Sequence, residues 1–554
     1  MDRNLCWARC LWLAAALCLA AALAQGQPAA TAVKRKSRAD VTAFRARVEA
    51  ALAEAGADRG YWGVLVADAT TGEELYTLNA QRYFAPASSA KLFATALALA
   101  TLGPDYRFRT TVETRGTVDS DGRLRGDLVL AGRGDPNLSN RRFPFEKQTE
   151  RDGPAEKVLG ELVEGVWARG IRQIEGDVVA DDSYFAYERF PSGWAIDDMM
   201  WGYGAAVSAL AVNDNTLSLE LRPGGHEGDP AWFSVDPWAD YYSIQNEVRT
   251  SPTGSERKLA VSREPGSRLF VLSGTLPVGA EPARLTLAVE EPAEHAAHLL
   301  LRLLEARGIH VYGEARARHL PRTELGDTPT PAGKPSVLAE HLSVPLADAV
   351  RFVNKVSQNL HAELVARVAA REKAAATTAE AALKFAQEFF KSAGIDEDDV
   401  VLTDGSGLSR RDLVTPRAEV KLLEYAARQP WGAVFRSTLP VAGDDGTLAE
   451  RMKNTPAAGR IWAKTGSLEH VAALAGYGTS VRGEELVFAI FGNNQSLHGS
   501  AASSVVDKIC VAMVEELGTR REKGSSKGAW LLKPRDAAAW RATEAFFSLA
   551  SFAF

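Results

Sequence analysis

The residue pattern of this chain changes character in its middle, and this change constrains the fold most. Residues Tyr106–Arg322 read as short strands separated by Gly- and Pro-rich turns, whereas helical spacing dominates the segments on either side. Two strands are predicted early, within Tyr61–Leu78, and two late, at Leu474–Ser480 and Leu486–Phe491. Because the late strands can complete the sheet that the early ones begin, we expect an α/β domain interrupted by a large β-rich insertion.

A chain of 554 residues exceeds the usual size of one hydrophobic core, so several domains are expected. The predicted parts are residues 1–24 as a signal peptide, 39–105 together with 336–517 as the discontinuous α/β domain, 106–335 as the inserted β-rich domain or domains, and 518–554 as a tail. The stretch Gly326–Pro335 is predicted to return the chain from the insertion.

The N-terminus has the pattern of a secretory signal. Arg3 and Arg9 precede an apolar run from Leu11 to Ala24, which is short for a bilayer span and ends in small residues. We expect cleavage near Ala24 and a periplasmic location, with an uncleaved anchor as the alternative. Cleavage would leave Cys510 as the one cysteine of the mature chain, which suits an oxidising compartment.

The net charge and the C-terminal tail indicate whether the chain binds nucleic acid or membranes. The formal charge of -6, without a long basic block, argues against nucleic acid. The tail beyond Gly518 begins polar and ends in apolar and aromatic side chains, among them Trp540 and Phe554. It predicts either an amphipathic helix with weak membrane association, or an end that is poorly ordered or packed on the core.

Ser88 and Lys91 form the first of three short motifs that carry chemistry. The run Leu92–Leu102 predicts a helix, so Ser88 lies at a helix start, and residues three apart share one helix face. A serine nucleophile needs an adjacent base, and a lysine is a base only when neutral. Burial and a nearby cation, for which Lys464 is the candidate, would lower the pKa of Lys91. The alternative is a helix-capping serine beside a solvated lysine.

The second motif is Ser357-Gln358-Asn359, inside the predicted helical segment Leu346–Arg371 and at a turn or helix junction. Its hydroxyl would relay a proton to a departing amine, and its amide would hold the peptide group of a substrate. An ordinary helix cap is the alternative, because Ser-x-Asn is common by chance.

The third motif is Lys464-Thr465-Gly466, predicted on a strand opposite the nucleophile. A cation and a hydroxyl suit a substrate carboxylate, and the glycine lets substrate backbone lie close to the strand. The backbone N–H groups of Ser467 and Ser88 are the natural oxyanion-hole pair.

The joint order of the three motifs is typical of penicillin-binding proteins and class A β-lactamases. From about Ala39 to Leu517 the chain resembles the low-molecular-mass class C penicillin-binding proteins, the D-alanyl-D-alanine carboxypeptidase/endopeptidase family S13 of the penicillin-binding protein 4 type. The stretches Leu402–Arg410 and Gly132–Pro136 also resemble family stretches. The large insertion disfavours an ordinary class A β-lactamase.

The resemblance implies a serine β-lactamase/DD-peptidase-like domain, with an antiparallel sheet flanked by helices. It also implies that Pro191–Met199 of the insertion reaches the active site, where Asp198 would meet the free amino group of a diaminopimelate-type side chain. Ile196 stands where relatives tend to have an aromatic residue, and Asp197 is the neighbouring acid, so a shift by one residue and an acidic surface loop are alternatives. The same pocket would be lined by Tyr203, Leu408 and Arg410.

The implied reaction is acylation of Ser88 by the terminal D-Ala-D-Ala of peptidoglycan stem peptides or cross-links, and by β-lactam antibiotics. Two alternatives remain open: a β-lactamase, which would need rapid deacylation, and a catalytically silent peptidoglycan-binding protein. No metal is expected, because His295 and His298 lack a third ligand, and no cofactor is implied.

Overall fold

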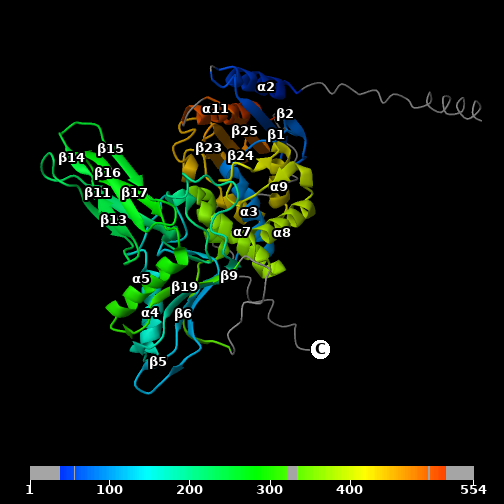
Figure 1. The fold of residues 1–554 in the computed structure, drawn as a ribbon. Coiled ribbons are helices and arrows are strands. Elements are labelled where there is room, and N and C mark those ends of the chain that lie inside the picture. Colours follow the sequence, from blue (N-terminus) through cyan, green and yellow to red (C-terminus); the bar gives the residue numbers. More distant parts are fainter. Residues whose placement is uncertain (1–37, 55, 322–333, 497–499, 519–554) are drawn as a thin grey trace, which may run out of the picture.

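The computed structural model describes residues 38–54, 56–321, 334–496 and 500–518 (Figure 1). Its central five-stranded sheet joins segments from both ends of this range, in the order β2 (Glu74–Leu78), β1 (Tyr61–Asp68), β25 (Glu485–Asn493), β24 (Val471–Thr479) and β23 (Ile461–Leu468). Neighbouring strands of this sheet run antiparallel. The predicted completion of the sheet by the late strands is confirmed.

Alternate side chains of β25 enter two different cores, as the two-residue period of a strand requires. Val487, Ala489 and Phe491 lie in the core on one face of the sheet, and Leu486, Phe488 and Ile490 lie in the core on the other. Both faces are therefore covered, which explains the continuous apolar run in this strand.

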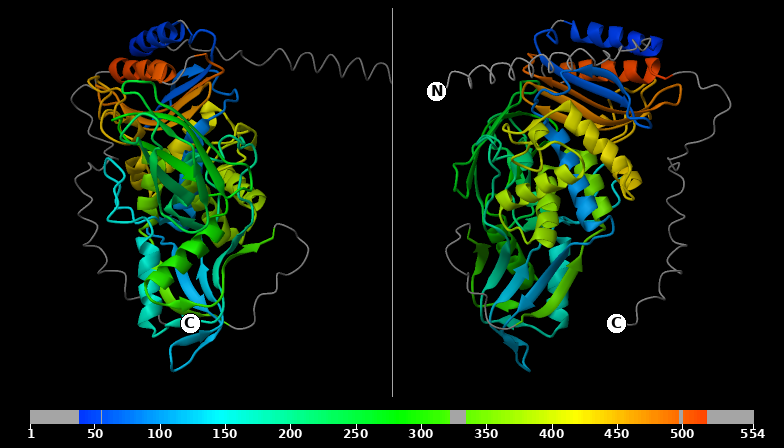
Figure 2. Two further views of the ribbon diagram at one scale, coloured as in Figure 1. Left: turned by 60° about the vertical axis from the view of Figure 1, so that its left-hand side comes forward. Right: turned by 90° about the vertical axis from the view of Figure 1, so that its right-hand side faces the viewer.

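Helices cover both faces of the central sheet (Figure 2). On the outer face, α2 (Ala39–Leu52) and α11 (Ser500–Glu516) pack against each other. The opposite layer contains α3 (Lys91–Leu102), α6 (Leu346–Phe352), α7 (Asn359–Ala374), α8 (Ala379–Ser392), α9 (Pro416–Ala427) and α10 (Gly432–Thr438). The catalytic motifs predicted from the sequence lie at the junction of this layer and the sheet.

The insertion between α3 and α6 contains several sheets (Figure 1). The largest has the order β19 (Ala315–Leu320), β9 (Val178–Ala186), β6 (Leu128–Ala131), β3 (Arg109–Thr114) and β20 (Ser336–Leu342). It packs against α4 (Lys157–Ala168) and α5 (Pro292–Ala306). Smaller sheets comprise β18 (His310–Val311), β8 (Gln173–Ile174), β5 (Arg123–Arg125) and β4 (Thr117–Val118), and the pair β10 (Leu210–Val212) and β7 (Asp135–Leu138).

Two further sheets of the insertion lie to one side in Figure 1, and we call them the side sheets. One has the order β12 (Trp232–Asp236), β11 (Thr216–Arg222) and β17 (Ala283–Ala288). The other contains β13 (Ser243–Asn246), β16 (Leu269–Pro277) and β14 (Arg249–Ser251), with β15 (Lys258–Ser262) also paired to β16. The predicted β-rich character of the insertion is confirmed.

The return from the insertion lies later than the sequence suggests. Strand β20 begins at Ser336 and pairs with β3, so the largest inserted sheet extends beyond the predicted boundary at residue 335. The other domain bounds stay predictions. The signal peptide, most of Gly326–Pro335 and nearly all of the tail lie outside the described residues. Within the described segments, no helix has both the length and the apolarity that a membrane crossing requires.

The predicted helical segment Leu346–Arg371 is interrupted at the second motif. Helix α6 continues into a π-helical turn, Val353–Ser357, after which Gln358 is extended and α7 begins at Asn359. Ser357 has a φ of 67°, a left-handed conformation that is unusual for a residue other than glycine. The expected turn or helix junction is confirmed, and it ends one helix and starts another within the motif.

Candidate active site

Ser88 lies in a 3-10 turn, Ala87–Ala90, that leads directly into α3. Lys91 is the first residue of that helix, and its Nζ lies 2.8 Å from the Ser88 Oγ. Ser88 is partly exposed, whereas the Lys91 side chain is fully buried. The first motif therefore places an accessible hydroxyl against a buried amine, as the spacing of three residues predicts.

The Lys91 amine has two further partners inside the protein. Its Nζ lies 2.6 Å from the Asn359 Oδ1 and 2.6 Å from the Ser406 carbonyl oxygen. Burial lowers the pKa of Lys91 to about 7, against the opposing effect of nearby acids, namely Asp404, Glu363 and Asp412. A substantial neutral fraction near neutral pH makes this lysine suitable as a general base for Ser88.

The second and third motifs meet through Lys464. Its Nζ donates a hydrogen bond of 2.8 Å to the Ser357 Oγ, and its side chain is fully buried. Burial, followed by the charge of Lys91, lowers the pKa of Lys464 well below its ordinary value, while Glu419 opposes the shift. The sequence predicts that burial and Lys464 both lower the pKa of Lys91; burial does lower it, whereas Lys464 is not among the causes of the shift.

Asn359 joins Lys91 to the insertion. While its Oδ1 accepts from Lys91, its Nδ2 donates to the Tyr203 carbonyl at 2.7 Å. The side chain belongs to the first residue of α7, immediately after the interruption described above. One amide therefore holds both the Lys91 amine and a segment of the insertion.

The third motif lies on edge strand β23, beside the turn that carries Ser88. A Cβ on Gly466 would lie 2.5 Å from the Pro86 carbonyl oxygen, so only glycine allows this close approach. The hydroxyls of Thr465 and Thr447 lie 2.8 Å apart. Thr447 is an additional polar group near the predicted carboxylate site that sequence reasoning missed. The oxyanion hole formed by the backbone N–H groups of Ser88 and Ser467 stays a prediction.

Asp198 and Tyr203 contact each other within the insertion. The Tyr203 OH donates to the Asp198 Oδ1 at 3.1 Å, and the Asp198 side chain is buried whereas Asp197 is exposed. Burial raises the pKa of Tyr203 to about 12, aided by the negative charge of Asp198 and opposed by Arg410. This arrangement favours Asp198 over Asp197 as the acid of the pocket. Ile196 is 71% exposed.

The two remaining predicted pocket residues differ in their surroundings. Leu408 is buried and forms part of the core that contains the helical layer. Arg410 is exposed, and its backbone N–H lies 3.4 Å from the Gly193 carbonyl oxygen. Their roles in binding stay predictions.

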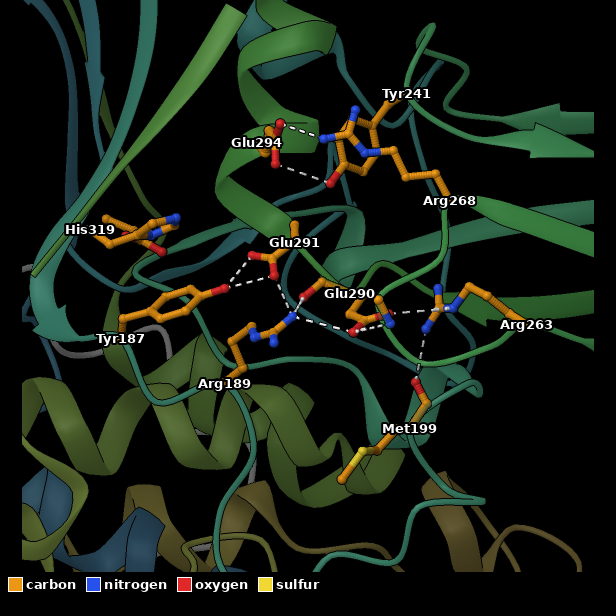
Figure 3. A network of polar contacts seen from close by, with 12 residues as sticks. Tyr187, Arg189, Met199, Tyr241, Arg263, Arg268, Glu290, Glu291, Glu294 and His319 are labelled. Atoms are coloured by element: carbon orange, nitrogen blue, oxygen red, sulfur yellow. Dashed lines mark hydrogen bonds and ion pairs between the residues drawn. The ribbon is translucent and has the colours of Figure 1, made fainter. Parts of the chain in front are cut away.

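The segment that carries Asp198 is anchored to the side sheets by a polar network (Figure 3). Arg263 Nη2 donates to the Met199 carbonyl at 3.4 Å, and its Nε lies 3.8 Å from a Glu290 carboxylate oxygen. The Arg263 side chain is 4% exposed. Figure 3 shows the network continuing through Glu291, Arg189 and Tyr187. The side sheets therefore help to hold Pro191–Met199, the segment predicted to reach the active site.

A serine hydroxyl beside a buried lysine, set between an antiparallel sheet and a helical layer, defines an active-site serine hydrolase of the Ser-x-x-Lys class. The model of the D-Ala-D-Ala carboxypeptidase 3 (S13) family matches residues 44–516. The chain belongs to this family, which confirms the predicted resemblance.

Individual relatives agree over most of their length. The D-alanyl-D-alanine carboxypeptidase of Actinomadura sp. (strain R39) is 35% identical over 508 residues, covering 90% of this chain and 89% of the relative. D-alanyl-D-alanine carboxypeptidase DacB of Haemophilus influenzae is 29% identical over 430 residues, covering 76% and 82%. The crystal structure of penicillin binding protein 4 from Haemophilus influenzae matches with a TM-score of 0.72 and 25% identity, covering 84% of this chain and 98% of that one. The predicted fold class is confirmed.

Proposed function

We propose that this chain is a serine-type D-Ala-D-Ala carboxypeptidase and endopeptidase that acts on peptidoglycan peptides through an acyl-enzyme on Ser88. The observation that carries the proposal is the 2.8 Å contact between the Ser88 Oγ and the buried Lys91 Nζ. Membership of the S13 family and the names of the two carboxypeptidase relatives support the same reaction.

The reaction begins when neutral Lys91 takes the proton of the Ser88 hydroxyl. The Ser88 oxygen attacks the carbonyl carbon of the penultimate D-Ala, and the backbone N–H groups of Ser88 and Ser467 stabilise the developing oxyanion. Lys464 and Thr465 hold the terminal carboxylate, whose negative charge favours the protonated form of Lys464.

Ser357 then delivers a proton to the amine of the departing D-Ala. Its hydroxyl accepts a hydrogen bond from Lys464 and regains a proton from Lys91, which had taken one from Ser88, so Lys91 is neutral again after the leaving group departs. Water hydrolyses the ester, freeing the shortened peptide and regenerating Ser88. A cross-linked peptide that enters in the same orientation is cleaved by the same steps, which gives endopeptidase activity.

A β-lactam antibiotic opens its ring on Ser88 by the same attack and leaves slowly. The pocket of Asp198, Tyr203, Leu408 and Arg410 recognises a stem-peptide side chain with a free amino group, and the Asp198–Tyr203 contact supports this assignment. Peptidoglycan stem peptides, their cross-links and β-lactams are therefore the proposed partners.

The proposed place of action is the periplasm, reached after cleavage of the signal near Ala24. The support is the N-terminal sequence pattern. Weak membrane association through the tail stays a prediction of the sequence.

The test is intact-mass analysis after incubation with benzylpenicillin, followed by peptide mapping. We expect one adduct on Ser88 in the wild type and none in Ser88→Ala. Ser504→Ala is the matched control, since Ser504 is exposed on α11 at the outer face of the sheet, and it should acylate like the wild type.

The same preparation separates the proposed function from its alternatives. Release of D-Ala from a peptide ending in D-Ala-D-Ala, with a persistent penicilloyl adduct, supports the carboxypeptidase. Rapid turnover of a chromogenic cephalosporin would identify a β-lactamase. Binding of wall fragments without an adduct or D-Ala release would identify a silent binding protein and overturn the proposal.

A further inference from the structure

Asp404 is a buried carboxylate at the centre of the loop that faces Lys91. Asp404 is only 2% exposed. Oδ1 accepts hydrogen bonds from the backbone N–H groups of Ser406 at 3.1 Å and Gly407 at 2.6 Å. Oδ2 accepts from the Ser406 hydroxyl at 3.0 Å and the Ser409 N–H at 2.8 Å. One carboxylate thereby determines the path of the loop from residue 404 to residue 409.

This loop presents a backbone carbonyl to the proposed general base. The Ser406 oxygen lies 2.6 Å from the Lys91 Nζ, and both the backbone N–H and the hydroxyl of Ser406 are bound to Asp404. The next residue, Gly407, has a φ of 76°, and a Cβ there would lie 1.8 Å from the Ala87 carbonyl oxygen. The loop therefore packs directly on the residue before Ser88 and cannot move without disturbing the nucleophile.

Asp404 also has a partner in the insertion. The Trp194 indole Nε1 donates to its Oδ2 at 2.8 Å, and Trp194 is 7% exposed. Trp194 precedes Asp198 by four residues in the segment predicted to contact substrate. The carboxylate therefore links the substrate segment to the loop that contacts Lys91.

We propose that Asp404 is a positioning residue for the Ser88–Lys91 pair, and that Trp194 couples the inserted segment to that pair through it. The inference rests on the proposed function, because it concerns the same acylation step. The five hydrogen bonds that the Asp404 carboxylate accepts hold the Ser406 carbonyl in place, and this carbonyl orients the Lys91 amine toward Ser88.

Several charged groups surround Lys91, and the test has to take account of each. Asp404, Glu363 of α7 and Asp412 of the same loop region raise its pKa. Lys464 of β23 interacts electrostatically with Lys91 and with Glu419 of α9. Burial raises the pKa of Glu363 to about 7 and that of Asp412 well above its ordinary value, with Asp404 adding to both shifts. Asp404 is the member of this group that also holds the loop.

The decisive variant is Asp404→Asn, which keeps the side-chain shape. Its NH₂ group would replace one carboxylate oxygen and would face N–H and O–H donors that need an acceptor. We expect the rate of acylation by benzylpenicillin at pH 8.5 to fall about ten- to a hundredfold, because small displacements of a base cost rates of this order. The midpoint of the pH–rate profile should move to lower pH, since one negative charge near Lys91 is lost. At long times the whole population should still become acylated.

Trp194→Phe tests the coupling to the insertion, because it removes the indole N–H and keeps an aromatic ring. We expect a smaller loss of acylation rate, about two- to tenfold. Trp431→Phe is the matched control: Trp431 is similarly buried, at 8% exposed, but packs beside Tyr425 and Phe435, away from this loop. Its acylation rate should equal that of the wild type.

The outcomes are separable. A folded Asp404→Asn protein with the wild-type acylation rate and pH midpoint would overturn the positioning role. The role would also be overturned if fewer molecules could be acylated but those that could reacted at the wild-type rate. An unchanged Trp194→Phe rate would overturn the coupling. If the wild type itself is not acylated on Ser88, the proposed function fails instead.

Discussion

Acidification should suppress acylation of Ser88 in a way that reports the state of Lys91. The lysine acts as a base only in its neutral form, and burial brings its pKa to about 7. Below that value the neutral fraction falls about tenfold for each pH unit, so the rate should be about one-tenth of its plateau at pH 6 and about one-hundredth at pH 5. Above about pH 8 the rate should level off.

The assay measures the second-order rate constant of adduct formation with benzylpenicillin between pH 5 and pH 9. Samples are quenched at intervals, and intact-mass analysis gives the acylated fraction. Circular dichroism at each pH shows whether the fold persists, and return of an acid-treated sample to pH 8 should restore the full rate. Ser88→Ala provides the baseline.

Two results would refute the assignment of the base. A rate that stays flat from pH 5 to pH 9 would mean that no group with a pKa near 7 controls the step. A rate that still rises steeply between pH 8 and pH 9 would mean that Lys91 keeps the pKa of a solvated lysine, and that its burial does not have the effect described here.

Further substitutions test the other motifs. Ser357→Ala should slow D-Ala release about 10²-fold through loss of the proton donor; release at the wild-type rate would exclude that role. Gly466→Ala should abolish acylation and lower the free energy of unfolding by about 1–3 kcal/mol, because its methyl group would meet the Pro86 carbonyl at 2.5 Å; thermal unfolding measures the second effect, and an unchanged melting temperature would contradict it. Asp198→Asn should reduce about tenfold the preference, in kcat/KM, for a peptide with a free side-chain amine over its acetylated form, the size of one charge-assisted hydrogen bond; equal preference in variant and wild type would remove Asp198 from the pocket.

The parts of the fold that follow local periodicity could be predicted from the sequence. Apolar runs at both ends of the chain identified the central sheet, and the spacing between Ser88 and Lys91 placed amine and hydroxyl together. The interruption between α6 and α7 appears in the sequence only through the second motif, because helical spacing continues across it. The contact between Ser357 and Lys464 accompanies that break and joins residues 107 positions apart.

Other features of the site had no sequence signal strong enough to assign them. Asp404-Gly-Ser-Gly is typical of a turn, since aspartate side chains often bind backbone N–H groups two or three residues on. Its hydrogen bond from Trp194 joins residues 210 positions apart, which the local pattern does not reveal. The acid Glu363 is likewise an ordinary helical residue in the sequence, and only tertiary packing buries it beneath Lys91.

The sheet that unites both ends of the chain also sets the order of events during folding. Ser88 is synthesised early, but Ala85, three residues before it, is held by Asn493, 408 residues later, and Lys464 comes almost as late. A nascent chain that lacks its last strands has the Ser88–Lys91 pair without Lys464, and a β1 edge without β25. Contacts of such long range make folding slow. On the proposed mechanism, the motif that holds the substrate carboxylate is missing until the final strands dock, so hydrolytic activity would report that the central sheet is complete.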